Sequence, residues 1–271
     1  MGDIRQLRHV FAEDWDWSTG GEEWSSWWGG TPALWYGALL PRIHSFIPAG
    51  TILEIAPGFG RWTQYLKSSC ERLILVDLAP KCIEHCRARF SEDAHIEYHV
   101  NDGRSLDMVE DGSLDFVFSW DSLVHADRDI LDDYVRELSR KLAPNGVAFL
   151  HHSNVASQSL RHRISMRTPE RVRRPLVRRG VLLDVYAWRS PTVDAASVAD
   201  MMARHGLVCV GQEVFSWEHG PHLTEAISLL TPAGSRWARP GPVITNRSFR
   251  RDGARMARLY AASSFRSPAE P

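Results

Sequence analysis

Two groups of polar side chains follow apolar runs of the chain and could transfer protons or bind a metal ion. Asp121 and His125 come after one run, and His151, His152 and Asn154 come after the next. Short apolar runs indicate buried strands, and an open α/β sheet binds its ligands where such strands end. Asp121 and His125 are four residues apart, so they share a face if their segment is helical. Imidazole and carboxylate groups at one sheet edge suit a general base or a divalent cation.

A glycine turn precedes these groups and has the pattern of a nucleotide site. Residues 52–56 read as a buried strand and residues 61–66 resume at helical spacing, with Gly58 and Gly60 between them. Because glycine has no Cβ, backbone N–H groups in this turn can approach a ligand at the helix N-terminus. The next apolar run ends in Asp77, where a nucleotide-binding sheet places a carboxylate on ribose hydroxyls.

The spacing Glu54-x-x-x-Gly58-x-Gly60, followed by Asp77 and by the turn 101–103, resembles the motifs of class I S-adenosylmethionine (SAM)-dependent methyltransferases. The resemblance implies a Rossmann-like α/β fold with a seven-stranded sheet, and SAM as the cofactor. In that family the turn after the third strand holds the adenine amine, a role we assign to Asp102. The residues expected to bind SAM are Glu54, Ala56, Gly58, Gly60, Trp62, Asp77, Leu78, Asp102, Gly103 and Ser119. The alternatives are a dinucleotide enzyme and an α/β scaffold without catalysis.

Methyl transfer to a hydroxyl needs a group that removes the proton of the acceptor, because an alcohol is a poor nucleophile at neutral pH. We predict His152 as the general base, supported by Asp121, with His125 as a second candidate. Metal-dependent O-methyltransferases of the superfamily have acidic ligands after the same two strands. Mg²⁺ or another divalent cation held by Asp121, His125 and His152 is therefore an alternative, although imidazole ligands favour zinc or manganese.

The aromatic N-terminal segment bears on the substrate. The stretch from Trp24 to Trp62, with 151–154 and 186–189, is similar to actinobacterial sugar O-methyltransferases, including mycobacterial methylmannose polysaccharide enzymes. Tryptophan faces stack on pyranose rings, so we expect a small-molecule or oligosaccharide acceptor. The candidate substrate-binding residues are Trp28, His151, Asn154, Trp188 and Arg189. An aromatic or polyketide acceptor is the first alternative. The others are a nucleic-acid methyltransferase and a protein that binds SAM without catalysis.

The order of patterns predicts three parts. Residues 1–50 form a tryptophan-rich cap that ends in a helix over 35–46, and residues 51–232 form the methyltransferase domain. Within the domain, residues 155–190 form an arginine-rich substrate lid after the fifth strand. The third part, residues 233–271, is an irregular C-terminal arm. The strands are expected at 52–56, 73–76, 96–100, 114–119, 147–150, 207–215 and 224–230, and the later helices at 80–90, 130–142 and 193–205.

Composition limits the partners. The formal net charge of −1 makes nucleic acid an unlikely bulk partner, although nine arginines lie between residues 161 and 189. The four cysteines lack a paired metal spacing, and we expect reduced thiols. The first nine residues are polar and no apolar run approaches the length of a membrane span, so we expect a cytoplasmic protein with no membrane partner. A homodimer through the cap or the tail is compatible with the sequence.

Overall fold

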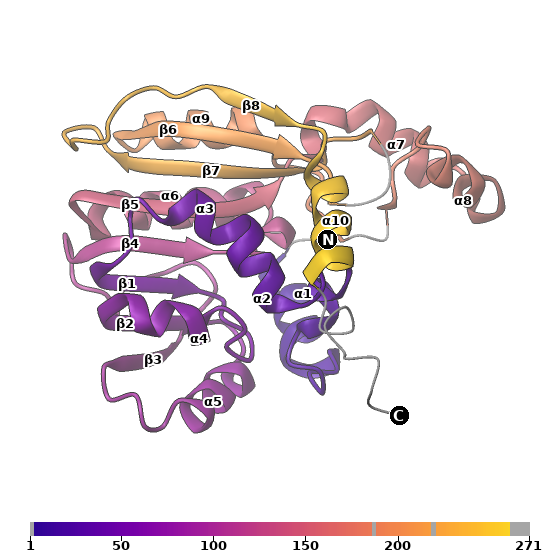
Figure 1. The fold of residues 1–271 in the computed structure, drawn as a ribbon. Coiled ribbons are helices and arrows are strands. Elements are labelled where there is room, and N and C mark those ends of the chain that lie inside the picture. The colour runs from indigo at the N-terminus through magenta and orange to yellow at the C-terminus, as the bar shows by residue number, and fades with distance from the viewer. Residues whose placement is uncertain (1–2, 186–187, 218–220, 261–271) are drawn as a thin grey trace, which may run out of the picture.

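The computed structural model describes residues 3–185, 188–217 and 221–260, which form an α/β fold around one mixed sheet (Figure 1). The sheet has the strand order β3-β2-β1-β4-β5-β7-β6-β8. Strands β1 to β5 pair in parallel, β7 pairs antiparallel with β5 and β6, and β8 pairs in parallel with β6. The strands are β1 (Ala49–Ile55), β2 (Cys70–Asp77), β3 (Ile96–Val100), β4 (Leu114–Ser119), β5 (Leu142–Ser153), β6 (Leu207–Phe215), β7 (Glu225–Pro232) and β8 (Val243–Asn246).

Helices cover both faces of the sheet, with α3 in front and α6 and α9 behind it in Figure 1. The helices of the domain are α4 (Thr63–Leu66), η4 (Lys67–Ser69), α5 (Pro80–Arg89), η5 (Leu123–His125), α6 (Arg128–Lys141) and α9 (Ala195–Arg204). The predicted α/β architecture and the seven predicted strands are confirmed, three of them (96–100, 114–119 and 207–215) with the predicted bounds.

The N-terminal segment is a chain of short helical turns, and its part up to residue 34 lies at the carboxyl end of the parallel strands (Figure 1). Glycines interrupt it, and Gly21 and Gly29 both adopt a positive φ at the ends of η2. Between residue 3 and Pro32 the chain forms only short helical turns, as predicted, and the helical stretch that follows leads into β1. The elements are α1 (Ile4–Arg8), η1 (His9–Asp14), η2 (Glu22–Trp28), α2 (Thr31–Leu34), η3 (Trp35–Leu39) and α3 (Leu40–Ile43).

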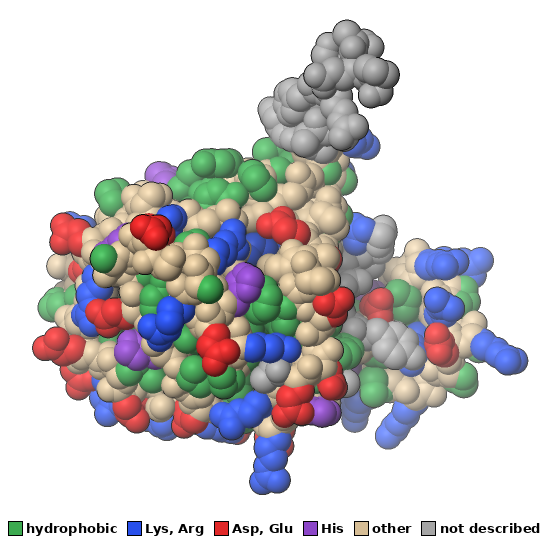
Figure 2. Space-filling view, turned by 90° about the horizontal axis from the view of Figure 1, so that it is seen from below, with side chains coloured by type: hydrophobic (Ala, Val, Ile, Leu, Met, Phe, Trp, Pro, Cys, Tyr) green, Lys and Arg blue, Asp and Glu red, His purple; other side chains and the backbone are tan. Residues whose placement is uncertain are grey.

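The arginine-rich insert after β5 forms two helices that project from the body of the protein, as Figures 1 and 2 show. It consists of η6 (Val155–Gln158), α7 (Ser159–Arg167) and α8 (Glu170–Arg178). Residues 186 and 187, near its end, lie outside the described residues. Within the described residues no helix has the length and apolar character needed to cross a membrane.

The C-terminal arm is not irregular between 243 and 260, so this prediction is wrong. Strand β8 extends the sheet to eight strands, and α10 (Phe249–Tyr260) packs on the N-terminal segment. A Cβ built on Gly253 would lie 2.3 Å from Trp27 and 2.7 Å from Trp28, so only glycine permits this close packing. Sequence periodicity missed this arrangement because β8 has only four residues and its pairing with β6 is long-range.

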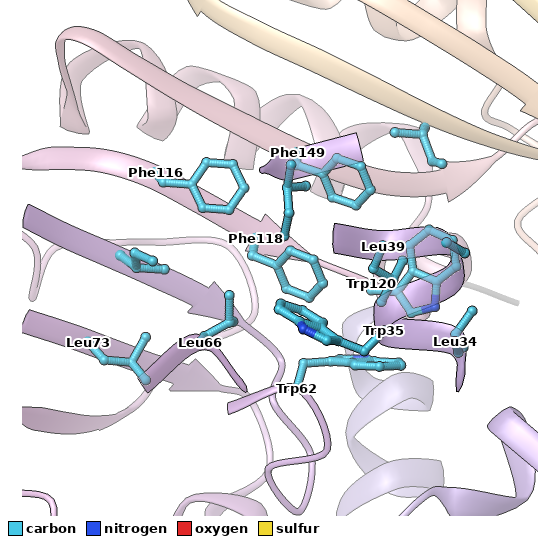
Figure 3. Close-up of a cluster of buried hydrophobic side chains, with 14 of the residues drawn as sticks. Leu34, Trp35, Leu39, Trp62, Leu66, Leu73, Phe116, Phe118, Trp120 and Phe149 are labelled. Atoms are coloured by element: carbon cyan, nitrogen blue, oxygen red, sulfur yellow. The ribbon is translucent and has the colours of Figure 1, made fainter. Parts of the chain in front are cut away.

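An aromatic core joins the N-terminal segment to the sheet (Figure 3). The ring of Trp35 stacks on Tyr65 at 4.9 Å between centroids and lies 6.3 Å from Trp62 and 6.2 Å from Phe118. Phe118 in turn stacks on Phe149 at 5.5 Å. Because Trp28 and Trp35 of the segment are buried in this core, the segment packs as part of the folded domain.

Candidate functional site

A cavity opens at the carboxyl ends of the first, second and fourth strands, where the sequence predicts a ligand site. The empty space in this cavity, counted together with adjoining open solvent, is about 890 Å³. Its floor comes from the turns after β1, β2 and β4. Its roof comes from the N-terminal segment, whose side chains there are Ile4, Leu7, Phe11, Trp17 and Trp24.

The glycine turn and Asp77 form one hydrogen-bonded unit on the cavity floor. Gly58 adopts a φ of +59° and its N–H donates to Oδ2 of Asp77 at 3.2 Å. The other carboxylate oxygen accepts the N–H of Ala79 at 2.8 Å. Burial raises the pKa of Asp77 to about 6, although these backbone donors oppose the shift. The structure thus brings together Gly58, Asp77 and the neighbouring cavity residues Ala56, Trp62, Leu78 and Gly103, all six of them predicted.

Four predicted SAM residues lie outside the cavity lining. A Cβ on Gly60 would lie 2.5 Å from the Phe90 ring, so this glycine permits packing on α5. Asp102 is exposed, and its carboxylate accepts the N–H groups of residues 104 and 105 instead of facing the cavity. Ser119 is buried and donates to the Ile55 carbonyl at 3.3 Å. Glu54 is also buried, and it accepts a hydrogen bond from the Thr63 hydroxyl at 2.6 Å.

Asp121 lies in the cavity wall, at the centre of a buried ionic network. One oxygen lies 3.2 Å from the Arg61 guanidinium and the other 3.5 Å from Arg189. Arg189 also donates to Glu225 at 2.6 Å, and Glu225 lies 3.1 Å from Nε2 of His151. Burial alone would raise the pKa of Asp121, but Arg189 and Arg61 outweigh it and hold the pKa below its ordinary value. Asp121 is therefore an ionised partner of two arginines.

His125 is the predicted catalytic histidine that reaches the cavity. Its Nδ1 lies 2.5 Å from the carbonyl oxygen of Trp188. A carbonyl only accepts hydrogen bonds, so Nδ1 bears the proton and Nε2 of the neutral ring is free to accept one. Burial, and then the charge of Arg189, lower the pKa of His125 to about 4. The ring is therefore neutral at pH 7.

Backbone strain coincides with this part of the site. Among the described residues, the non-glycine residues with a positive φ are Ala56, Asp121 and Trp188. The first two line the cavity, and the third supplies the carbonyl that binds His125. Such conformations cost roughly 1–3 kcal/mol each and tend to occur at functional sites.

The structure places His152, the predicted general base, outside the cavity lining. It is fully buried and both ring nitrogens are engaged, one with the Ser153 carbonyl at 2.9 Å and one with the Ser228 hydroxyl at 2.8 Å. Adjacent residues of a strand face opposite sides of the sheet, and His151 takes the side of Trp120, on which its ring stacks at 4.1 Å. His151 accepts the N–H of Asp121 at 3.1 Å, so it helps to hold the backbone of Asp121 without lining the cavity itself.

The predicted substrate residues are dispersed. Trp28 packs on Phe249 in the core. Asn154 accepts the N–H of Ala195 at 3.0 Å and donates to Leu223 at 2.8 Å, which is a structural role. Trp188 and Arg189 adjoin the cavity through their contacts with His125 and Asp121, while His151 lies beneath it.

The predicted cation site is not assembled. Asp121 is bound by two arginines, and His152 does not line the cavity and has both ring nitrogens engaged by Ser153 and Ser228. Across the described ranges no group of three or more histidine, cysteine, aspartate or glutamate side chains is placed to hold a metal ion. These residues do not fit a divalent cation, and we assign no step to one.

Known proteins resemble the part of the chain that forms the cavity floor. Residues 52–146 match the family model described as a methyltransferase domain. Nodulation protein S of Rhizobium tropici is 32% identical to the chain over 63 residues, which are 23% of this chain and 26% of that protein. Nodulation protein S of Bradyrhizobium diazoefficiens is 30% identical over 112 residues, which are 41% of this chain and 52% of that protein.

The chain thus spans between about a quarter and about half the length of these two curated relatives. The crystal structure of a SAM-dependent methyltransferase from Clostridium acetobutylicum superposes with a TM-score of 0.52 and 13% identity, over 84% of this chain and 96% of that chain. The predicted Rossmann-like class I methyltransferase fold is confirmed.

Sequence reasoning missed residues that complete the site around the cavity. Arg61, directly after the glycine turn, is buried, lies over the Trp24 ring at 5.2 Å and donates to the Gly21 carbonyl and the Ser25 hydroxyl. It therefore connects the N-terminal segment to Asp121. Its position beside the motif was the available signal. No sequence signal was available for Glu225 or for Ile4 and Leu7 of α1, because only long-range contacts bring these residues to the site.

Proposed function

We propose that this protein is a SAM-dependent methyltransferase that transfers a methyl group to a hydroxyl of a sugar acceptor. The observation that carries the proposal is the cavity itself. It joins the glycine turn and Asp77 on its floor with tryptophan side chains in its roof and His125 in its wall. The match of residues 52–146 to a methyltransferase domain supports SAM as the donor.

The floor of the cavity suits SAM. Asp77 offers carboxylate oxygens to ribose hydroxyls, and the N–H of Gly58, in a turn where a Cβ would lie 2.8 Å from the Trp17 ring of the roof, holds that carboxylate in place. The apolar lining from Ile55, Val76 and Leu78 suits an adenine ring. When bound, SAM supplies an electrophilic methyl carbon on its sulfonium. The protein must then orient the acceptor and accept its proton.

His125 replaces His152 as our candidate for the proton acceptor. Its neutral ring keeps Nε2 unprotonated, because the Trp188 carbonyl binds the proton on Nδ1. The hydroxyl proton of the acceptor would pass to Nε2. Asp121 takes a positioning role, since its pairing with Arg61 and Arg189 connects the cavity wall to the N-terminal segment and to the end of the insert.

Charge balance supports a hydroxyl over an amine as the acceptor. The two arginines and the two carboxylates of the buried network, Arg61, Arg189, Asp121 and Glu225, sum to zero formal charge. An ammonium group would find no surplus negative charge there, whereas a neutral hydroxyl needs none. A neutral imidazole with an unprotonated nitrogen is the partner that a hydroxyl requires.

Tryptophan faces around the cavity support a sugar ring. Trp24 lines the cavity and lies 5.3 Å from Trp15, which meets Trp188 edge-on at 6.5 Å. These rings extend from the N-terminal segment to the end of the insert, consistent with the predicted lid. The largely apolar lining also favours a second candidate acceptor, a planar phenol or polyketide hydroxyl.

The test combines binding and turnover. Calorimetry should detect binding of SAM and of its demethylated product to the full chain. Labelled SAM is then offered with short mannosides and glucosides, with phenols and with primary amines of similar size. We expect transfer to glycosides above the other two classes. Transfer to amines alone would refute hydroxyl methylation, and absence of any SAM binding would refute the function as a whole.

A further inference from the structure

The insert after β5 exposes apolar side chains to an unusual degree. Five of the eleven large exposed apolar residues found among the described residues lie between residues 159 and 181, the insert lobe, and each of the five is between 49% and 63% exposed. They are Leu160, Ile164, Met166, Val172 and Val181. Exposed apolar side chains gathered on one small lobe mark a contact surface.

The same lobe is strongly cationic. Between residues 159 and 181 there are eight arginines and one acid, Glu170, which gives a formal charge of +7 in a chain whose net charge is −1. Figure 2 shows the lobe at the right, with blue arginine side chains on its outer side and green apolar side chains between them. The exposed arginines are Arg161, Arg163, Arg167, Arg171, Arg174, Arg178 and Arg179.

Helix α8 separates the two kinds of side chain. Val172, Leu176 and Val177 follow helical spacing on one side, and Arg171, Arg174 and Arg178 follow it on the other. Val172 is exposed and the other two apolar residues are half-buried, so packing covers this side only in part. The helix is amphipathic and basic, with an apolar side that the rest of the chain leaves partly uncovered.

Internal hydrogen bonds hold the lobe in shape. The buried Arg173 of α8 donates to the carbonyls of Ser165 at 3.3 Å and Thr168 at 3.4 Å, both at the end of α7. The N–H of Leu183 donates to the Ser165 hydroxyl at 3.0 Å. The surface is therefore formed before any partner binds, and binding need not order the helices.

We propose that the insert lobe, residues 159–181, docks on the surface of a bilayer that contains anionic lipids. Lipid headgroups would pair with the exposed arginines while the aliphatic side chains enter the interface between headgroups and acyl chains. A nucleic-acid partner would explain the arginines but not the exposed aliphatic side chains. Residues 159–181 include no tryptophan, tyrosine or phenylalanine on which bases could stack. The inference is independent of the acceptor of the proposed function.

A peripheral contact of this kind needs no spanning helix. The lack of an apolar run long enough to cross a bilayer excludes a spanning segment but not contact with the membrane surface. The structure adds the mixture of arginine and aliphatic side chains on a preformed lobe. Each arginine near an anionic surface contributes about fivefold to partitioning, an effect that salt weakens.

Vesicle sedimentation of the full chain tests the proposal. Phosphatidylcholine vesicles are compared with vesicles that also contain phosphatidylglycerol, at low and high salt. We expect binding to the anionic vesicles only, weakened by salt. The variant Leu160→Ser/Ile164→Ser/Val172→Ser should lose about tenfold in partitioning at low salt. The variant Arg163→Gln/Arg167→Gln/Arg171→Gln should lose more, and its residual binding should depend less on salt.

The matched control is Val243→Ser/Ile244→Ser on β8, where both residues are more than half exposed. We expect it to bind vesicles like the wild type. Circular dichroism melting confirms that each variant folds. Three results would overturn the proposal: no wild-type binding to anionic vesicles at low salt, an equal loss in the β8 control, or tighter binding to single-stranded RNA that the serine substitutions leave unchanged.

Discussion

Replacing Glu54 by glutamine tests whether the acid of the first motif is held protonated in the fold. The side chain is 1% exposed, one oxygen accepts a hydrogen bond from Thr63, and the other has no hydrogen-bond partner among the described residues. Burial raises the pKa of Glu54 from 4.5 to about 8, although Thr63 opposes the shift. Such a raised pKa means that ionising the carboxyl destabilises the folded state.

The sign and size of the effect follow from proton linkage. The pKa is higher in the folded state, so the stabilisation by proton binding is complete below about pH 4.5 and is lost as the pH rises through about 8. Integrated between pH 5 and 9, the free energy of unfolding should fall by about 4 kcal/mol through this group. Glu54→Gln removes the titration. The glutamine NH₂ group replaces the carboxyl oxygen that has no hydrogen-bond partner. Burying this unpaired donor lowers the free energy of unfolding by about 1–3 kcal/mol at every pH.

The assay is urea unfolding of both proteins at about pH 5, 7 and 9. Glu54→Gln should be no more stable than the wild type at the lowest pH and more stable at the highest, and the difference between the two proteins should change by about 4 kcal/mol in total. Taking the difference cancels the titration of all other groups that the two proteins share. A difference that stays constant across this range would refute the raised pKa of Glu54.

Three further substitutions and one treatment test the site. His125→Asn should lower kcat by about 10²–10⁴-fold with little change in SAM affinity, and full turnover would contradict its role as proton acceptor. His152→Asn should cost about 1–3 kcal/mol of stability in urea unfolding, but the folded variant should keep its kcat. SAM affinity should fall as the pH drops through about 6, where Asp77 is protonated, and calorimetry on Asp77→Asn should show weaker binding that no longer varies there. Excess chelator should leave turnover unchanged, and a loss that magnesium restores would show that a cation takes part.

The buried network around Asp121 gives the insert a direct connection to the cavity. Arg189 ends the insert and contacts both Asp121 and Glu225, while the neighbouring Trp188 carbonyl orients His125. Breaking a buried ion pair by removing one partner leaves an uncompensated charge. The orientation of the proposed proton acceptor therefore depends on how the insert packs, although no residue of the insert is among those that line the cavity.

Local sequence was sufficient for most of the sheet and for the floor of the cavity. Apolar runs bounded by turn residues predict strands, and those at 96–100, 114–119 and 207–215 have the observed bounds. The turn at Gly58 and the acid Asp77 were found for the same reason. Gly58 is identified because it has no Cβ, and Asp77 because it ends an apolar run. Both features can be recognised from short stretches of sequence.

Tertiary structure alone decided which histidine reaches the cavity and what Asp121 does. In β5, His152 faces Ser228, and the pairing of β5 with β7 sets that contact across 76 residues of sequence. Arg189 and Glu225 reach Asp121 and His151 only after the insert and β7 have packed. The roof, β8 and α10 were also outside the reach of periodicity. Periodicity reports which side of an element is apolar, whereas the partner of that side is chosen by packing between distant segments.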